Sequence, residues 1–163
     1  KASRDGRVAD YAREFGLIYL EGKQPWSVPV DIALPCATQN EINGQDAQNL
    51  VNNGVKYVAE GANMPSDADA IAVFQKNGVV YAPGKASNAG GVAVSGLEMS
   101  QNSVRQYSTF EVLDDQLKNI MKNIHDDCFA HGKQADGSVD YKKGANVAGF
   151  EKIAKAMVNY GVL

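Results

Sequence analysis

The stretch VKYVAEGANMPSDADAIAVFQKNGVVYAP, residues 55–83, decides the fold class of this chain. It begins and ends with short apolar runs, residues 55–61 and 79–83, which stop at glycine or proline. Runs of this length, rich in valine and tyrosine, predict strands. The segment between them has helical periodicity. The stretch therefore predicts a strand, a helix and a strand with short connections, which is the building unit of a parallel sheet.

The helix inside this stretch has recognisable boundaries. Ser66 follows Pro65 and precedes two aspartates, which predicts Ser66 as the N-cap of a helix with an acidic first turn. The helix is expected to end near Asn77 and Gly78, because both residues favour a stop there. The side chains expected to face the core are Ala68, Ile71, Ala72 and Phe74.

The chain before this stretch continues the same alternation of strands and helices. VDIALP, residues 30–35, predicts a strand covered on both faces, and residues 45–53 predict a short helix that stops before Gly54. LIYLE, residues 17–21, is a further strand candidate. Together these segments predict an α/β fold with a mostly parallel sheet.

Helices are expected at both ends of the chain. Residues 1–16 open directly in helical periodicity and stop at Gly16, with one apolar face made by Val8, Tyr11, Ala12 and Phe15. Ser108 and Glu111 have the spacing of a capping box, which predicts the start of a long helix. The apolar stripe of that helix consists of Phe110, Leu113, Leu117, Ile120, Ile124 and Cys128. A last helix follows a polar loop, with Val147, Phe150, Ile153, Ala154 and Met157 expected to face inward.

Composition narrows the possible functions. A length of 163 residues suits one domain, and 44% hydrophobic and 21% charged residues are close to average soluble usage. A net charge of −3 without a basic tract argues against binding to nucleic acid, and no apolar run is long enough to predict a membrane span. Cys36 and Cys128 lack metal-ligand spacing and are interpreted as buried free thiols. We expect a soluble cytoplasmic protein, cut from a larger one because no Met precedes the first helix.

Two motif candidates fail on spacing. His125 and Cys128 share a helix face, but His131 lies about a third of a turn away, so we interpret Cys128 as a core residue between surface histidines and expect no metal site. The run from Gly78 to Lys85 differs from a phosphate loop, because it is one residue too long and lacks the Ser or Thr that binds Mg²⁺. The sequence also contains no G-x-G-x-x-G dinucleotide turn.

Three polar segments follow the ends of the predicted strands. They are PCATQNEI, EGANMP and PGKASNAGG, at residues 35–42, 60–65 and 83–91. In open α/β sheets, ligands bind outside the carboxyl ends of the strands. These segments contain unionised amides and hydroxyls among small residues, which can orient a neutral group such as a carboxamide or a ribose. The sequence therefore predicts a ligand site at this edge of the sheet.

PCATQNE, EGANMP and NAGGVAVSGLEMSQN, in this order and spacing, resemble the C-terminal part of hexameric glutamate dehydrogenases, especially the bacterial NADP-type enzymes. The resemblance runs from KASRDGRVADYA to GANVAGFEKIAKAMVNYGV, which is essentially the whole chain. It implies an oxidoreductase of amino-acid metabolism and nitrogen assimilation. The reaction would be the reversible reductive amination of 2-oxoglutarate with ammonia and NADPH to L-glutamate. The family's glycine-rich turn and its catalytic lysine and aspartate precede the matched segment, so no catalytic residue is assigned here and the chain alone is expected to be inactive.

The resemblance also implies a domain organisation. Residues 1–105 would be the second half of a Rossmann-like, doubly wound nucleotide-binding domain. Residues 106–163 would be C-terminal helices that pack back toward a substrate domain outside this chain. A homohexamer in the cytoplasm is expected for the full-length protein.

Site residues follow from the resemblance, position by position. Ser95 matches the serine that binds the γ-carboxylate of the substrate, and Val92 matches a residue that lines its side chain. Asn63 and Asn88 match asparagines near the nicotinamide and its ribose, and the loop of Thr38 and Gln39 passes near the cofactor. Lys1, Arg4 and Arg7 match basic residues that approach the 2′-phosphate of NADP. NAD remains an alternative cofactor.

Two other functions remain open from the sequence. A leucine, phenylalanine or valine dehydrogenase shares the NAGGV segment, but Ser95 favours glutamate because a substrate carboxylate needs a hydrogen-bond donor. A non-catalytic α/β module that binds a nucleotide or a protein partner is the other alternative.

Overall fold

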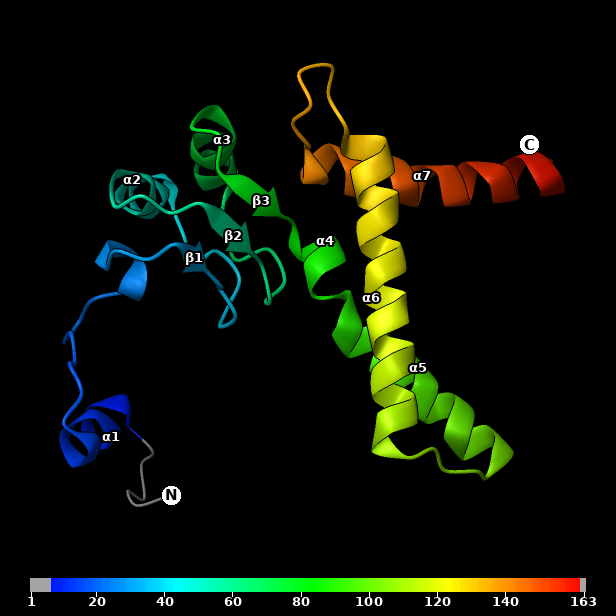
Figure 1. The fold of residues 1–163 in the computed structure, drawn as a ribbon, viewed down its shortest axis with the longest axis horizontal. Coiled ribbons are helices and arrows are strands. Elements are labelled where there is room, and N and C mark those ends of the chain that lie inside the picture. Colours follow the sequence, from blue (N-terminus) through cyan, green and yellow to red (C-terminus); the bar gives the residue numbers. More distant parts are fainter. Residues whose placement is uncertain (1–6, 162–163) are drawn as a thin grey trace.

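The computed structural model describes residues 7–161, and Figure 1 shows an α/β unit followed by a group of long helices. Among the described residues, no helix combines the length and the apolar character that crossing a membrane requires. The elements follow one another in the order α1 (Val8–Phe15), the 3₁₀ helix η1 (Pro25–Ser27), β1 (Ile32–Ala33), α2 (Gly44–Asn52), β2 (Tyr57–Ala59), α3 (Ala68–Lys76), β3 (Val80–Ala82), α4 (Gly84–Ser87), α5 (Ala89–Val104), α6 (Phe110–Gly132) and α7 (Tyr141–Tyr160).

The three strands form one parallel sheet in the order β1-β2-β3, which confirms the predicted α/β fold. Each strand lies inside its predicted apolar run but is shorter than that run. Ile32 is in register with Tyr57, and Tyr57 with Val80. Ile32, Tyr57 and Val80 therefore form a first row across the sheet, and the residues one position later, Ala33, Val58 and Tyr81, form a second row. Because neighbouring side chains on a strand point to opposite faces, the two rows lie on opposite faces of the sheet.

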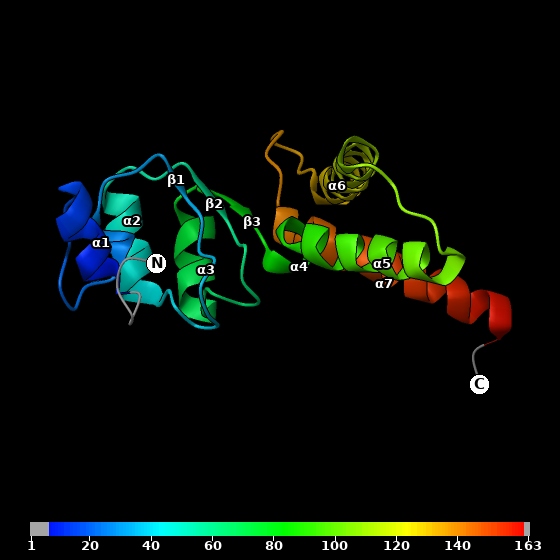
Figure 2. The same cartoon turned by 90° about the horizontal axis from the view of Figure 1, so that it is seen from below.

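The second row, Ala33, Val58 and Tyr81, lies on the covered face and is buried. Helices α2 and α3 pack against each other on this side of the strands, as Figure 2 shows. Leu50 of α2 and Phe74 of α3 are almost fully buried there, and the Phe74 ring stacks on Tyr81 at 6.0 Å between centroids. This cluster is the main core of the described chain.

The first row lies on an open face. Ile32, Tyr57 and Val80 are 56%, 49% and 40% exposed, and in Figure 2 no described helix covers this side of the strands. Leu34, at the end of β1, is 60% exposed. The expectation that residues 30–35 form a strand covered on both faces is therefore wrong for the described residues, because only one helical layer packs on this sheet.

Helix boundaries differ from the prediction at two N-termini. The N-cap of α3 is Asp67, whose Oδ1 accepts a hydrogen bond from Ala70 N at 2.7 Å; Ser66 instead forms a bridge with Ile42. The N-cap of α6 is Thr109, so the predicted capping box at Ser108 is absent; the Ser108 N–H is bound by the Gln101 side chain at 2.6 Å. In both cases a tertiary contact holds the serine outside the helix.

The core-facing residues of α3 also differ from those predicted. Ala70 and Phe74 are buried, whereas Ala68 and Ala72 are exposed. Ile71, which was also expected in the core, is partly buried against it. The buried pair is four residues apart, which is the spacing of side chains on one face of a helix.

The N-terminal segment confirms one prediction and contradicts another. Helix α1 ends at Gly16 in the left-handed conformation with φ 64°, as expected, but only Ala12 of its apolar face is buried. The strand predicted at residues 17–21 is absent, and Ile18 is 91% exposed. A strand needs a partner for its backbone groups, and no described strand lies beside this segment.

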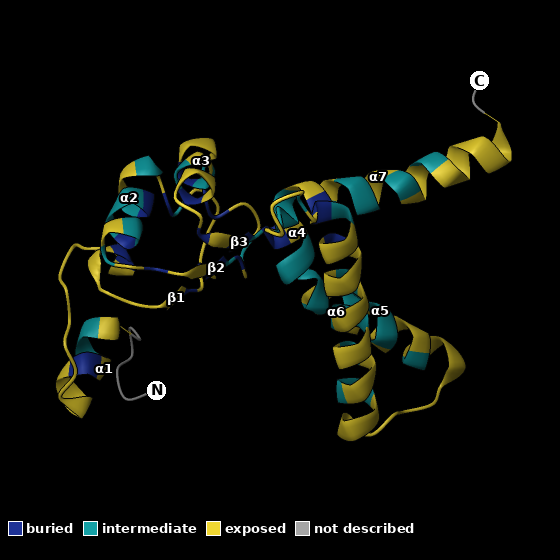
Figure 3. Ribbon diagram, turned by 45° about the horizontal axis from the view of Figure 1, so that its top comes forward, coloured by how far each residue is buried: buried dark blue, intermediate teal, exposed yellow. Residues whose placement is uncertain are grey.

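Helices α6 and α7 cross closely at Gly144, where an added Cβ would collide with the carbonyl oxygen of Cys128. The predicted stripe of α6 is buried or half-buried except Phe110, which is 77% exposed. On α7, Val147 and Ala154 are half-buried. The expected inward positions Phe150, Ile153 and Met157 are instead exposed, and Figure 3 shows the C-terminal part of α7 extending away from the rest of the chain.

The two cysteines have different surroundings, so the prediction of a buried thiol is confirmed for Cys128 and wrong for Cys36. Cys36 is exposed in the loop after β1, and Cys128 is buried at the crossing of α6 and α7. Burial raises the pKa of the Cys128 thiol, and the neighbouring charge of Asp127 adds to the increase.

Candidate functional site

The segments that follow the three strands meet at the carboxyl edge of the sheet. Pro35 O, after β1, accepts hydrogen bonds from Gly61 N at 2.9 Å and from Ala62 N at 3.1 Å. Glu60 N, after β2, donates to Ala82 O of β3 at 3.1 Å. The three polar segments identified in the sequence are therefore held side by side by backbone hydrogen bonds.

Asn63 and Asn88 lie in direct contact at this edge. Asn88 Nδ2 donates to Asn63 Oδ1 at 2.7 Å and to Ala62 O at 3.1 Å. Asn88 is the residue between α4 and α5, with φ −95° and ψ 0°, and Asn63 lies in the exposed loop after β2. Two amides predicted separately from the sequence thus form one polar unit across 25 residues of chain.

The close approach of these segments depends on Gly84 at the start of α4. A Cβ at this position would lie 2.7 Å from Ala62 O and 3.3 Å from Glu60 Oε2. Any larger residue would therefore push α4 away from the loop that carries Asn63.

Val92 and Ser95 follow on α5 at a spacing that places them on one helix face. Val92 is 74% exposed, and the Ser95 hydroxyl donates to Gly91 O at 3.2 Å. The two glycines of this helix have different roles. An added Cβ at Gly90 would lie 3.3 Å from Leu117 of α6, whereas one at Gly91 would meet open space. Gly90 therefore serves helix packing, and Gly91 leaves the exposed side of α5 unobstructed.

Thr38 and Gln39 lie in the exposed loop after β1. This loop is anchored by Asn40, whose N–H donates to Met64 O at 2.9 Å and whose φ is 54°. Glu41 Oε1 accepts a further hydrogen bond from Ala37 N at 3.0 Å. The structure thus brings this loop beside the Asn63 loop, but gives neither the Thr38 nor the Gln39 side chain a hydrogen bond among residues 7–161.

The predicted basic cluster is only partly covered by the structure, since Lys1 and Arg4 lie outside the described residues. Arg7 is exposed and precedes α1 as its N-cap. Figures 1 and 2 place α1 on the β1 side of the sheet, whereas Asn88 follows β3 at the other end. Arg7 and the asparagine pair are therefore not brought together.

The histidines of α6 contact different residues of α7. His125 Nε2 lies 3.1 Å from the Tyr141 hydroxyl, and His131 Nδ1 lies 3.6 Å from Glu151 Oε1. Within the described part of the chain, no group of three or more His, Cys, Asp or Glu residues has the geometry of a metal site.

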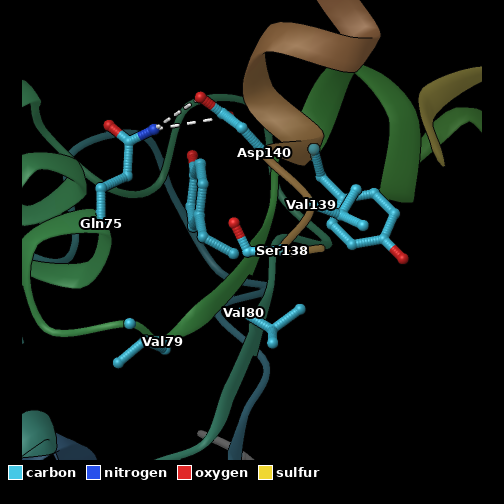
Figure 4. Close-up of a pocket in the computed structure, with 9 residues that line it drawn as sticks. Gln75, Val79, Val80, Ser138, Val139 and Asp140 are labelled. Carbon is cyan, nitrogen blue, oxygen red and sulfur yellow. Dashed lines mark hydrogen bonds between the residues drawn. The ribbon is translucent and has the colours of Figure 1, made fainter. Parts of the chain in front are cut away.

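A shallow pocket of about 290 Å³ lies away from these segments, between the outer edge of β3 and the connection from α6 to α7. Figure 4 shows Gln75 reaching toward Asp140, with Nε2 3.4 Å from both carboxylate oxygens. None of the predicted site residues lines this pocket. We therefore place the candidate site at the carboxyl edge.

Glu60 is a residue of this edge that the sequence analysis did not identify. Its side chain is buried, and its two carboxylate oxygens accept hydrogen bonds from the backbone of Gly84 and Ser66. Its own carbonyl oxygen accepts from Ser87 Oγ at 2.6 Å. The only signal in the sequence was the position of this acidic residue directly after an apolar strand. That position does not identify Glu60 as buried, because exposed acidic residues are equally expected there.

Comparisons with known proteins cover almost the whole chain. A family model described as glutamate/leucine/phenylalanine/valine dehydrogenase matches residues 1–161. The chain is 60% identical over 163 residues to the NADP-specific glutamate dehydrogenase of Escherichia coli K12, covering all of this chain and 36% of that protein. It is 54% identical over 162 residues to the NAD(P)-specific glutamate dehydrogenase of Xylanibacter ruminicola, covering 99% of this chain and 36% of that protein.

A crystal structure of Plasmodium falciparum glutamate dehydrogenase has the same fold, with a TM-score of 0.91 at 44% identity. The match covers 98% of this chain and 35% of that one. The chain thus spans about a third of the length of the relatives that it matches.

Proposed function

Because this chain belongs to the glutamate/leucine/phenylalanine/valine dehydrogenase family, we propose that it is the C-terminal third of an NADP-dependent glutamate dehydrogenase. The full-length protein would catalyse the reversible reductive amination of 2-oxoglutarate with ammonia and NADPH to L-glutamate. The family's catalytic lysine and aspartate lie outside the segment that this chain matches. We therefore expect no turnover from the 163 residues alone.

The observation that carries this proposal is the contact between Asn63 and Asn88 at the carboxyl edge of the sheet. Both side chains are unionised amides, and an amide can donate to and accept from a carboxamide or a ribose without adding charge. Gly84 and Gly91 keep the surrounding backbone free of bulk. These residues fit the nicotinamide end of a dinucleotide, which when bound would supply the hydride donor and acceptor of the reaction.

Substrate selection is assigned to α5. Ser95 would donate a hydrogen bond from its hydroxyl to the γ-carboxylate of the substrate in place of its present hydrogen bond to Gly91 O. Val92, on the same exposed face, would line the aliphatic part of the side chain. A substrate with an apolar side chain would leave the serine hydroxyl without a partner, so glutamate is favoured over leucine, phenylalanine or valine.

The preference for NADP is supported by Arg7 together with Lys1 and Arg4, whose positive charges suit a 2′-phosphate. NAD stays an alternative, since one relative of this chain is NAD(P)-specific. Thr38 and Gln39 are assigned to the same cofactor through their loop, which borders the loop of Asn63.

A homohexamer in the cytoplasm completes the proposal. The free thiols of Cys36 and Cys128 suit a reducing compartment. The exposed apolar side chains of α7 and of the open sheet face suit further contacts in a larger assembly.

The full-length protein tests this function directly. Isothermal titration should give a lower dissociation constant for NADPH than for NADH, and steady-state assays should show turnover of glutamate but not of leucine. Turnover of leucine with little glutamate activity would support the alternative of a leucine, phenylalanine or valine dehydrogenase. Absence of binding to either dinucleotide would contradict the proposal as a whole.

A further inference from the structure

A buried carboxylate lies behind the two amides of the candidate site. Glu60 follows β2 directly, and only 3% of its surface is exposed. An ionised carboxylate is expensive to remove from water unless hydrogen bonds compensate the loss. The position of this side chain therefore requires a structural or functional reason.

The two carboxylate oxygens are hydrogen-bonded to backbone groups from different segments. Oε2 accepts from Gly84 N at 2.7 Å, and Oε1 accepts from Ser66 N at 3.3 Å. Gly84 begins α4 after β3, and Ser66 ends the loop after β2. One side chain thus joins the loop of Asn63 to the helix that leads to Asn88.

Only a few residues separate Asn63 and Asn88 from Glu60 and its partner Gly84, and hydrogen bonds hold these segments together. Asn63 lies three residues after Glu60, and Asn88 lies four residues after Gly84 with its N–H donating to Gly84 O at 2.9 Å. The Ser87 hydroxyl bonds to Glu60 O as a further tie between the same segments. Movement of Gly84 would therefore shift Asn88 relative to Asn63.

Tyr81 supports this arrangement from the adjacent strand. The pKa of the Tyr81 phenol is raised, mainly by burial and further by the nearby carboxylate of Glu60. The carboxylate therefore interacts with β3 as well as with the segments on either side of it.

We propose that Glu60 is a positioning residue for the nicotinamide half of the cofactor, an inference that rests on the proposed function. Glu60 touches the backbone of Gly84 and Ser66 and acts on the cofactor only through Asn63 and Asn88. A Glu60→Gln substitution keeps the size of the side chain but replaces one acceptor oxygen with an NH₂ group. One of the two backbone N–H groups then faces a donor and loses its partner.

The test compares two ligands of the full-length protein by isothermal titration. NADPH contains the nicotinamide, and adenosine 2′,5′-bisphosphate contains only the adenosine half. Glu60→Gln should weaken NADPH binding about tenfold, the effect of one lost buried hydrogen bond. It should leave the affinity for adenosine 2′,5′-bisphosphate unchanged and lower the melting temperature only slightly, because one buried backbone N–H loses its acceptor.

Ser66→Ala is the matched control. It retains the backbone N–H that Glu60 accepts from, and it removes a buried hydroxyl that has no hydrogen-bond partner among the described residues. This variant should bind both ligands with the affinities of the wild-type protein.

Two results would overturn the positioning role while leaving the proposed function intact: unchanged NADPH affinity in Glu60→Gln, or equal weakening of both ligands together with a much lower melting temperature. The second result would assign Glu60 to stability alone. A wild-type protein that binds neither NADPH nor NADH would instead overturn the proposed function, and this inference with it.

Discussion

At the scale of the residue, Ser95 is the position that we propose selects the substrate. Its hydroxyl bonds to Gly91 O at 3.2 Å and lies on the exposed face of α5. Ser95→Val in the full-length protein should lower kcat/KM for glutamate on the order of 100-fold, because the γ-carboxylate of the bound substrate would lose a hydrogen-bond donor. Cofactor affinity, measured by titration, should stay the same.

Ser100→Val is a control for the effect of valine on the helix itself. The Ser100 hydroxyl donates to Gly96 O at 3.0 Å, which is the same type of hydrogen bond about 1.4 turns further along α5. This variant should keep wild-type kinetics. Unchanged glutamate kinetics in Ser95→Val would remove the assignment of the γ-carboxylate to this residue.

Cys128 should make the stability of the protein depend on pH in the alkaline range. Burial raises its pKa, so the folded state holds the thiol proton more tightly than the unfolded state does. The resulting stabilisation is present below the ordinary thiol pKa of about 8.5 and is lost as pH rises through the higher folded value. Urea unfolding at pH 7 and pH 10 should show a smaller pH-dependent loss in Cys128→Ala than in the wild type; equal losses would contradict this role.

At the scale of the element, the crossing of α6 and α7 depends on the absence of a side chain at Gly144. A Cβ there would collide with the backbone of Cys128, and backbone cannot move aside as a flexible side chain can. Gly144→Ala should therefore lower the free energy of unfolding by about 3 kcal/mol. Denaturant titration of the full-length protein measures this change.

Gly149→Ala, on the same helix, is the control. It separates the collision of a Cβ at position 144 with Cys128 from the effect of alanine on helix stability. An added Cβ at Gly149 meets nothing within 4 Å. This substitution should be neutral or stabilise the helix by about 1 kcal/mol, because alanine has the higher helix propensity. Equal losses of stability in the two variants would refute the close crossing.

At the scale of the whole molecule, the open sheet face should make the isolated chain self-associate. Ile32, Tyr57 and Val80 form an exposed apolar row across all three strands. Exposed apolar faces and unpaired strand edges both favour association between copies. Light scattering on the isolated 163-residue chain should give a mass above that of the monomer, and a monomer with a high melting temperature would contradict the prediction.

Tyr57→Lys tests whether the face itself is responsible. A charge in the middle of the row should shift the chain toward the monomer. Tyr107→Lys is the control, because Tyr107 is 89% exposed in the connection between α5 and α6 and lies outside the sheet. A similar reduction of mass in both variants would indicate a general effect of charge.

Much of the candidate site could be predicted because the relevant signals are local. Proline and glycine mark the ends of the strands, and parallel strands bring their carboxyl ends to one edge, so the segments that contain Asn63 and Asn88 were expected at the same edge. The division at residue 105 and the roles of the individual site residues stay predictions. Glu60 was missed because its burial depends on Gly84 and Ser66, which reach it from two other segments.

The sequence by itself determined the alternation of strands and helices from β1 to β3, the parallel sheet and the position of the polar segments, because periodicity and turn residues act over a few neighbouring positions. Only the tertiary structure decided which face of the sheet is covered, that Ser66 is buried beside Glu60 outside the helix, and that Asn88 donates to Asn63. These features depend on contacts between residues distant in the sequence, whose distances and angles no local pattern specifies.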